Sequence, residues 1–64
     1  MKKSELAQMY MPFSTTAAAV HRMMAWIKAH PELLARLATL GYQPRQKELT
    51  PAQVKAITDC LGEP

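Results

Sequence analysis

The stretch that decides the fold is Leu40–Val54, which reads LGYQPRQKELTPAQV. Gly41 can take the left-handed backbone conformation that ends a helix, so we expect a helix to stop there. Thr50 opens a capping box, Thr-Pro-Ala-Gln, with proline at the first helical position, which predicts that a new helix begins. The intervening Gln43–Leu49 has no helical periodicity. We expect it to form either a loop or one arm of a short hairpin, which would make a wing-like connector.

Start and stop signals outside this stretch predict three further helices. Ser4 is a suitable N-cap for a first helix, which Pro12 ends because a residue before proline disfavours helical geometry. A second and longest helix is expected over Ala17–Ala29, with capping oxygens available just before it. Pro31–Gly41 gives the third, because proline suits a first helical position. Together with the helix after the capping box, the chain of 64 residues predicts an all-α fold, a compact bundle of four short helices in a single domain.

Apolar residues recur at helical spacing in all four segments, and this spacing predicts the core. The expected core residues are Leu6, Tyr10, Val20, Met23, Trp26, Ile27, Leu33, Leu37, Leu40, Val54, Ile57 and Leu61. Phe13 in the first connection is expected to turn inward, and Met9 and Met24 are expected to fill the core. Burying one such side chain is worth about 1.5–3 kcal/mol, so Trp26→Ala should remove nearly all the stability of so small a domain.

Composition excludes several classes of site. Hydrophobic residues make up 48% and charged residues 20%, which is typical of a globular domain. Cys60 is the only cysteine, so there is no internal disulfide, and we interpret it as a half-buried apolar residue. His21 and His30 are too far apart for a metal-binding pair on one helix, so we expect no metal and no cofactor. The sequence shows no nucleophile with a base, no carboxylate pair and no glycine-rich phosphate loop, which predicts a protein that is not an enzyme and has no small-molecule substrate.

Targeting signals are also missing from the sequence. The Met-Lys-Lys start is followed by polar residues, and no apolar stretch has the length of a signal peptide or a membrane span. A lone thiol fits a reducing compartment. We therefore expect a cytoplasmic protein with no membrane partner.

The charge balance points to anionic partners. Eight Lys and Arg against five Asp and Glu give a net charge of +3, which favours anionic partners such as nucleic acid. The candidate nucleic-acid-binding residues are Thr16, His21, Arg22, Lys28, Arg45 and Lys47. His21, Arg22 and Lys28 would contact duplex DNA from the second helix. Thr16 would meet a phosphate near the N-terminus of that helix, and the two residues in the connector would hold the sugar-phosphate backbone. The alternative for all six is an ordinary solvated surface.

A family resemblance is carried by segments along the whole chain. These are Glu5-Leu6-Ala7, Tyr10, Pro12, Ala19, Trp26-Ile27, Pro31-Glu32-Leu33, Leu40-Gly41-Tyr42, Thr50-Pro51, Gln53-Val54, Ile57 and the terminal Leu61-Gly62-Glu63-Pro64. With them the sequence resembles a short uncharacterised family of Bacteroidales, the domain of unknown function 4248. The resemblance implies a small single-domain bacterial protein, and it implies no activity, cofactor or catalytic residue.

A looser resemblance concerns a type of DNA-binding head. Glu5-Leu6-Ala7, Thr16–Trp26 and Thr50–Ile57 occur in the order found in the winged helix-turn-helix heads of MerR-type regulators and excisionases. This resemblance implies a helix-turn-helix-like domain in which the second helix is the recognition helix and the connector is the wing. Our leading hypothesis is therefore a small DNA-binding or accessory regulatory protein, acting as a homodimer or with a protein partner.

The alternative hypothesis is a protein-protein interaction module. Such an adaptor would dock an amphipathic helix on an exposed apolar patch around Phe13, Met24, Trp26 or Tyr42. Surface character separates the two hypotheses. A continuous basic face spanning the second helix and the connector favours DNA, and an apolar groove rimmed by polar groups favours a protein partner.

Overall fold

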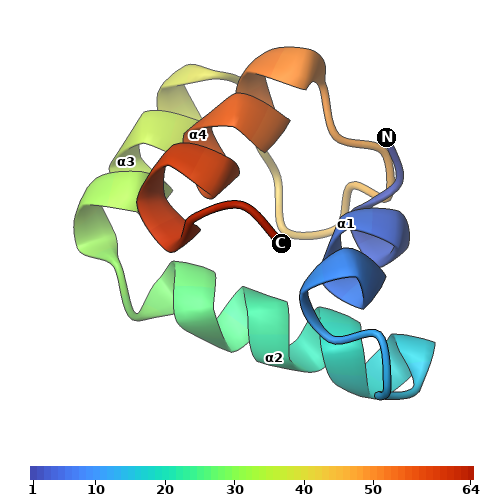
Figure 1. The fold of residues 1–64 in the computed structure, drawn as a ribbon. Coiled ribbons are helices and arrows are strands. Elements are labelled where there is room, and N and C mark those ends of the chain that lie inside the picture. Colours follow the sequence, from blue (N-terminus) through green and yellow to red (C-terminus); the bar gives the residue numbers. More distant parts are fainter.

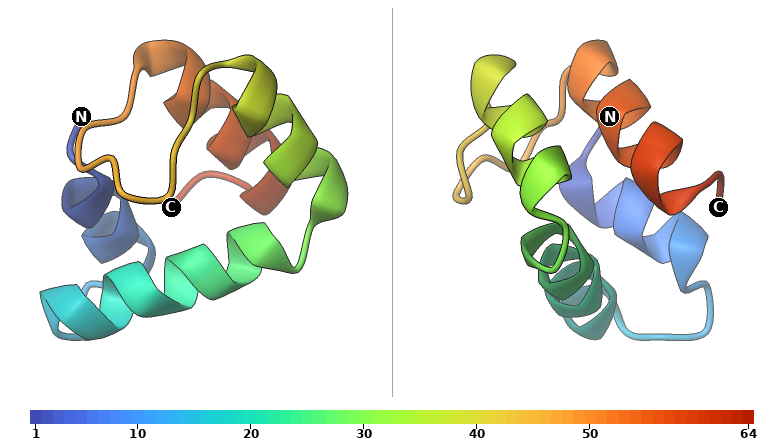
Figure 2. Two further views of the ribbon diagram at one scale, coloured as in Figure 1. Left: turned by 180° about the vertical axis from the view of Figure 1, so that it is seen from behind. Right: turned by 90° about the vertical axis from the view of Figure 1, so that its left-hand side faces the viewer.

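Four helices make up the protein in the computed structural model, which describes residues 1–64. They are α1 (Lys3–Tyr10), α2 (Thr16–Lys28), α3 (Pro31–Thr39) and α4 (Pro51–Leu61). Figure 1 shows α2 running along one side of the molecule, with α1 against its N-terminal half and α3 and α4 side by side beyond its other end. The two views in Figure 2 show the same arrangement from behind and from the side. The expected all-α bundle of four short helices is confirmed.

Local capping chemistry sets the start of α2 and α4. The Thr15 hydroxyl accepts a hydrogen bond from the Ala18 N–H at 3.2 Å. At α4 the Thr50 hydroxyl accepts from the Gln53 N–H at 3.2 Å, and the Gln53 side-chain oxygen accepts from the Thr50 N–H at 3.1 Å. This is the expected capping box. Gly41, with φ 77°, follows α3 in the left-handed conformation that we expected there.

The start of α1 differs from the prediction, because Ser4 is not its N-cap. The helix begins at Lys3, and Lys2 is the N-cap residue without a side-chain cap. The Glu5 carboxylate accepts from the Lys2 N–H at 3.1 Å. The Lys3 N–H donates to the Lys47 carbonyl at 2.7 Å. The start of α1 therefore combines a local bond to Glu5 with pairing to a distant segment, and a search for local caps cannot detect the second.

The core contains ten buried hydrophobic residues from all four helices and the connector. Six of them are predicted core residues, namely Leu6, Met23, Ile27, Leu33, Leu37 and Ile57. Four were missed by the sequence analysis, namely Ala7, Ala19, Leu49 and Ala56. The three alanines have small side chains, which allow neighbouring helices to approach closely. A pattern search that weights large apolar residues overlooks such positions.

Other expected core residues lie at the edge of the core or outside it. Five pack against the core but are only partly buried, namely Tyr10, Val20, Leu40, Val54 and Leu61. Trp26 was wrongly placed in the core, because 39% of it is exposed and its ring meets the edge of the Tyr10 ring at 6.1 Å between centroids. Phe13 and Met9 were also wrongly expected inside: Phe13 is 102% exposed and Met9 51%. Truncating Trp26 should therefore cost less than the whole folding free energy.

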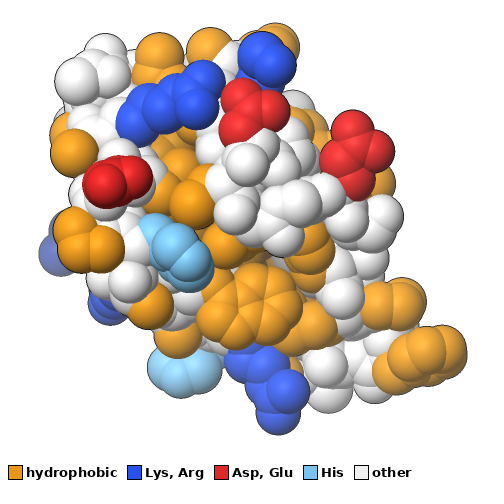
Figure 3. Space-filling view, turned by 60° about the vertical axis from the view of Figure 1, so that its left-hand side comes forward, with side chains coloured by type: hydrophobic (Ala, Val, Ile, Leu, Met, Phe, Trp, Pro, Cys, Tyr) orange, Lys and Arg blue, Asp and Glu red, His pale blue; other side chains and the backbone are white.

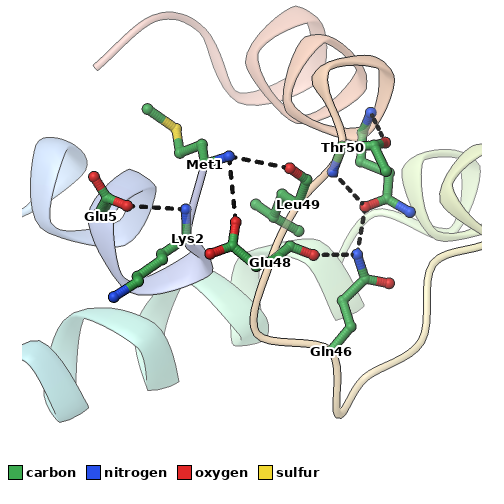
Figure 4. A network of polar contacts seen from close by, with 8 residues as sticks. Met1, Lys2, Glu5, Gln46, Glu48, Leu49 and Thr50 are labelled. Atoms are coloured by element: carbon green, nitrogen blue, oxygen red, sulfur yellow. Dashed lines mark hydrogen bonds and ion pairs between the residues drawn. The ribbon is translucent and has the colours of Figure 1, made fainter.

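The connector between α3 and α4 is a loop that pairs with the start of the chain. It forms no hairpin, and its only β-type pairing is an isolated antiparallel bridge between Lys2 and Glu48. The Leu49 N–H donates to the Met1 carbonyl at 2.7 Å, and the Met1 nitrogen donates back to the Leu49 carbonyl at 3.2 Å, as Figure 4 shows for the second bond. With 3% of its surface exposed, Leu49 anchors the connector in the core.

Candidate nucleic-acid interface

All six predicted nucleic-acid-binding residues have exposed side chains. Four lie on α2 and two in the connector, and they are Thr16, His21, Arg22, Lys28, Arg45 and Lys47. The structure does not gather them in one patch, so they do not form the continuous basic face that would favour DNA. It distributes them over the outer face of α2, its two flanks and the neighbouring connector.

The outer face of α2 combines small side chains with basic ones. Exposed alanines stand at Ala17, Ala18 and Ala25, on the same side of the helix as His21 and Lys28. No residue of α2 carries a carboxylate. The short alanine side chains therefore let another molecule approach the backbone of this helix closely, and no side chain on the helix carries a negative charge.

The two flanks of α2 face different neighbours. Val20 and Met24, four residues apart, share the flank nearer the connector, and the Met24 sulfur accepts a hydrogen bond from the Tyr42 hydroxyl at 3.1 Å. Arg22 and Trp26, also four residues apart, share the other flank. Arg22 is thus separated by the width of the helix from the connector cations.

A cleft of about 590 Å³ opens between the start of α1, the middle of α2 and the connector. Its lining residues are Lys2, Lys3, Ser4, Val20, Arg45, Gln46, Lys47 and Glu48. Four of these side chains are cationic, one is anionic and one is apolar. We call this hollow the basic cleft. It brings the two predicted connector residues together with two lysines that the sequence analysis did not assign to the site.

Lys3 is the best-anchored of these cations. Only 8% of the residue is exposed, its Nζ donates to the Pro44 carbonyl at 2.7 Å, and the ammonium lies 5.6 Å from the centre of the Tyr42 ring. Burial lowers the pKa of the Lys3 ammonium from its usual value. The sequence shows Lys3 only as part of a basic start, because its position depends on a connector that follows some forty residues later.

A hydrogen-bond network holds the connector in place beside the cleft. The Gln46 side-chain amide donates both to the Glu48 carbonyl and to the Gln53 side-chain oxygen (Figure 4). Gln53 is itself buried, and its side-chain amide donates to the Leu40 carbonyl at 3.0 Å. Every polar group of Gln53 that faces the interior therefore has a partner, which lets a neutral polar side chain sit in the core. This network fixes the backbone that carries the connector cations.

Ion pairing divides the basic residues into two groups. Arg36 on α3 and Lys55 on α4 both pair with Asp59, at 3.5 and 3.6 Å. Five exposed cations form no ion pair, namely Lys2, Arg22, Lys28, Arg45 and Lys47. The unpaired positive charge thus lies on α2, the connector and the residue before α1, whereas the charges of α3 and α4 are partly neutralised.

Thr16 and His30, near the two ends of α2, both interact with nearby residues. The Thr16 hydroxyl donates to the Gln8 side-chain oxygen at 2.7 Å, so its hydrogen is already used, although its oxygen can still accept. His30 precedes α3 but does not cap it with its side chain, and its Nδ1 lies 2.7 Å from the Trp26 carbonyl. Its imidazole is therefore associated with the end of α2.

A second face of the molecule is apolar. Figure 3 shows hydrophobic side chains in the centre of this face, with Lys, Arg, Asp and Glu toward its edges and histidine beside it. Over the whole molecule, the large hydrophobic residues that remain exposed are Met1, Met9, Phe13, Trp26 and Leu34. Two members of the predicted apolar patch, Met24 and Tyr42, are only partly exposed, and the Tyr42 hydroxyl donates a hydrogen bond to the Met24 sulfur.

The structure places few residues in positions that would suit other kinds of site. It brings together no group of three or more His, Cys, Asp or Glu side chains that could hold a metal ion. Cys60 is exposed, not half-buried as we expected. None of the four helices combines the length and the apolar character that crossing a membrane requires.

A family model described as a domain of unknown function (DUF4248) matches residues 1–64. The match extends over the entire chain, so the protein belongs to this family, and the family resemblance seen in the sequence is confirmed. No curated protein and no solved structure matches the chain.

Proposed function

We propose that this DUF4248 protein binds duplex DNA and acts as a small DNA-binding or accessory transcription-regulatory protein. The observation that carries the proposal is the distribution of the five unpaired, exposed cations. All of them lie on α2, in the connector or at the start of α1, and none lies on α3 or α4. Phosphate contacts from such cations supply most of the affinity of non-specific DNA binding.

The shape of α2 suits the major groove. A helix of 13 residues is about 20 Å long, and the groove of B-DNA, about 12 Å wide, admits one helix. Ala17, Ala18 and Ala25 would let the helix approach the base edges, and alanine methyls can contact the thymine methyl group. His21 and Lys28, on the same face, would supply hydrogen bonds to bases or phosphates.

Cations on both flanks of α2 suit the borders of the groove. The two sugar-phosphate backbones run along opposite sides of the groove, so an inserted helix needs positive charge on each side. Arg22 would serve one backbone, and Arg45 and Lys47 the other. The separation of Arg22 from the connector, which prevents a single basic patch, is therefore compatible with this mode of binding.

The apolar face supports a second candidate function, the protein-protein interaction module. Phe13 is fully exposed, and Met9 and Trp26 are exposed by half and by more than a third.

A single DNA-binding module of this size should bind weakly, so a homodimer or a protein partner would complement DNA binding. Half-sites of a dimer would lie about 34 Å apart along the duplex.

Fluorescence anisotropy of a labelled random-sequence duplex, titrated with the protein at low and at moderate salt, tests DNA binding. We expect saturable binding whose affinity falls steeply with salt. The double variant Arg22→Glu/Arg45→Glu should lose measurable binding. A matched control, Arg36→Glu/Lys55→Glu, makes the same change in net charge on α3 and α4 and should retain most of the affinity.

Circular dichroism of both variants separates binding from folding. Equal loss of affinity in the two variants would mean that only net charge matters and would refute the assignment to α2 and the connector. Absence of binding by the natural sequence at low salt and high protein concentration would refute DNA binding. The interaction module would then be the remaining candidate, to be tested by partner capture.

A further inference from the structure

The basic cleft brings together cations from two distant segments of the chain. The antiparallel bridge between Lys2 and Glu48, together with the hydrogen bond from the Lys3 N–H to the Lys47 carbonyl, sets the backbone of Lys3 across from that of Lys47. Both side chains line the cleft, and Arg45 lines it as well. An anion in the cleft would therefore meet positive charge from both segments.

Most side-chain N–H donors of the cations in the basic cleft have no hydrogen-bond acceptor within the protein. The Lys3 ammonium has three hydrogens and donates one of them, to the Pro44 carbonyl. Arg45 and Lys47 form no side-chain hydrogen bond and no ion pair. The one carboxylate of the cleft, Glu48, lies 3.5 Å from the Met1 amino group, which already offers it a positive partner. The cleft therefore has several free donors and little anionic charge to engage them.

The lining of the basic cleft indicates the kind of anion that fits. Its volume of about 590 Å³ lies within the range of small-ligand sites, and Val20 is its only apolar lining residue. A ligand with a large apolar or aromatic part would find little to contact there. A compact, multiply charged group with several acceptor oxygens would find an arginine and lysines within the same hollow.

We propose that the basic cleft binds one phosphate group, held by Lys3, Arg45 and Lys47. This inference deepens the proposed function and rests on it where the phosphate belongs to the DNA backbone. The phosphate of a free ligand would engage the same three side chains. The two cases differ only in the source of the phosphate, DNA or a free ligand, and the chemistry of the site is the same in both.

Nuclear magnetic resonance of the ¹⁵N-labelled protein tests the cleft directly. Inorganic phosphate is titrated into the protein, and sodium chloride of matched ionic strength is the reference. We expect saturable shifts of backbone amides in residues 2–4 and 45–48, with little change in α3 and α4. Arg45→Gln/Lys47→Gln should weaken phosphate binding at least about tenfold, since it removes two of the three charge-assisted donors. The matched control Arg36→Gln/Lys55→Gln should leave it unchanged.

A second readout uses thermal stability. A ligand that binds only the folded state raises the unfolding midpoint. Phosphate should therefore raise the midpoint of the natural sequence and of the control variant more than chloride does, but not that of Arg45→Gln/Lys47→Gln. Saturable shifts elsewhere, or none in the cleft, would overturn the inference.

The DNA titration identifies the source of the phosphate. If the cleft variant binds DNA more weakly and the slope of log affinity against log salt falls by about 1 for each removed contact, the cleft holds a backbone phosphate. If phosphate binds in the cleft but the natural sequence binds no DNA, the cleft inference holds and the proposed function fails. If DNA binds equally to both proteins and phosphate causes no shifts in the cleft, the inference and the assignment of Arg45 and Lys47 to the DNA interface both fail, whereas DNA binding itself stands.

Discussion

The two longest connections of this protein are built in opposite ways. Residues 11–15 join α1 to α2, and their hydrogen bonds reach only close neighbours: the Gln8 side chain donates to the carbonyls of Met11 and Ser14, at 3.1 and 2.8 Å. Residues 40–50 join α3 to α4, place Leu49 in the core and bond to the first residues of the chain. The short connection ends one helix and starts another, whereas the long one also holds distant parts of the chain together.

This difference relates side-chain burial to the role of a connection. Phe13, the largest residue of the short connection, is fully exposed and adds nothing to the core. Leu49, in the long connection, is buried as deeply as the helix residues around it. Substitutions in the two connections should therefore have very different effects on stability.

The largest effect is expected for Leu49→Ala. Truncation of a buried leucine costs about 2–5 kcal/mol, which is comparable to the entire folding free energy of a domain this small. We expect helical circular dichroism to show a variant that is largely unfolded at room temperature. The matched control is Leu34→Ala on α3, where 40% of the leucine is exposed, and it should remain folded. Similar stability of the two variants would show that the long connection does not anchor the fold.

A smaller loss is expected for Gln53→Met. Methionine keeps much of the side-chain volume but leaves the Leu40 carbonyl and the Thr50 N–H without their partner. Such a loss costs about 1–3 kcal/mol. Urea denaturation measures it, and the same substitution at the exposed Gln43 serves as control. A loss no larger than that of the control would mean that solvent replaces the buried hydrogen bonds.

Alkaline pH should weaken the fold through two tyrosines, one beside each connection. Burial raises the pKa of Tyr42, and burial and the nearby Glu63 carboxylate raise the pKa of Tyr10. A raised folded-state pKa contributes stability below the unfolded value of 10.0, and this stability is lost as pH rises through the folded-state value. Tyr10→Phe/Tyr42→Phe should therefore show a smaller fall in melting temperature between about pH 9 and 11. Lys3 titrates in the opposite sense in both proteins, so comparing them cancels its contribution. An equal fall in melting temperature in the natural sequence and in the variant would contradict the role of the tyrosines.

The smallest effect is expected for Phe13→Ser in the short connection. An exposed side chain has no buried contacts to lose, so the change in stability should stay within about 0.5 kcal/mol. Thermal unfolding followed by circular dichroism measures it, and solubility should improve because an exposed apolar ring is removed. A loss above about 1 kcal/mol would show that Phe13 packs against the protein after all.

The sequence predicts those parts of the fold that depend on neighbouring residues. The cap at Thr50, the helix end at Gly41 and the spacing of Met23 and Ile27 are all local signals, and the structure confirms them. The burial of Leu49 and Lys3 is not predicted, because each depends on a partner more than forty residues away. No periodic pattern records such a contact in a loop.

The candidate site follows the same rule. Exposure of Arg22, Arg45 and Lys47 could be expected from their charge and position. Their grouping could not, because which flank of α2 faces the connector is decided by how α1, α2 and the connector pack. The contribution of Lys2 and Lys3 to the basic cleft, and the pairing of two other cations with the single Asp59 carboxylate, likewise emerge only in three dimensions.

The bonds between Met1 and Leu49 have a consequence for the order of folding. They join residues 48 positions apart, whereas the contacts between successive helices close much shorter loops. Closing the longer loop costs more chain entropy, so we expect the pairing of residues 1–3 with 47–49 to form late in folding. The basic cleft exists only once that pairing is made. During synthesis, contacts between successive helices can therefore form before the basic cleft is complete, and the phosphate site that we propose would exist only in the fully folded molecule.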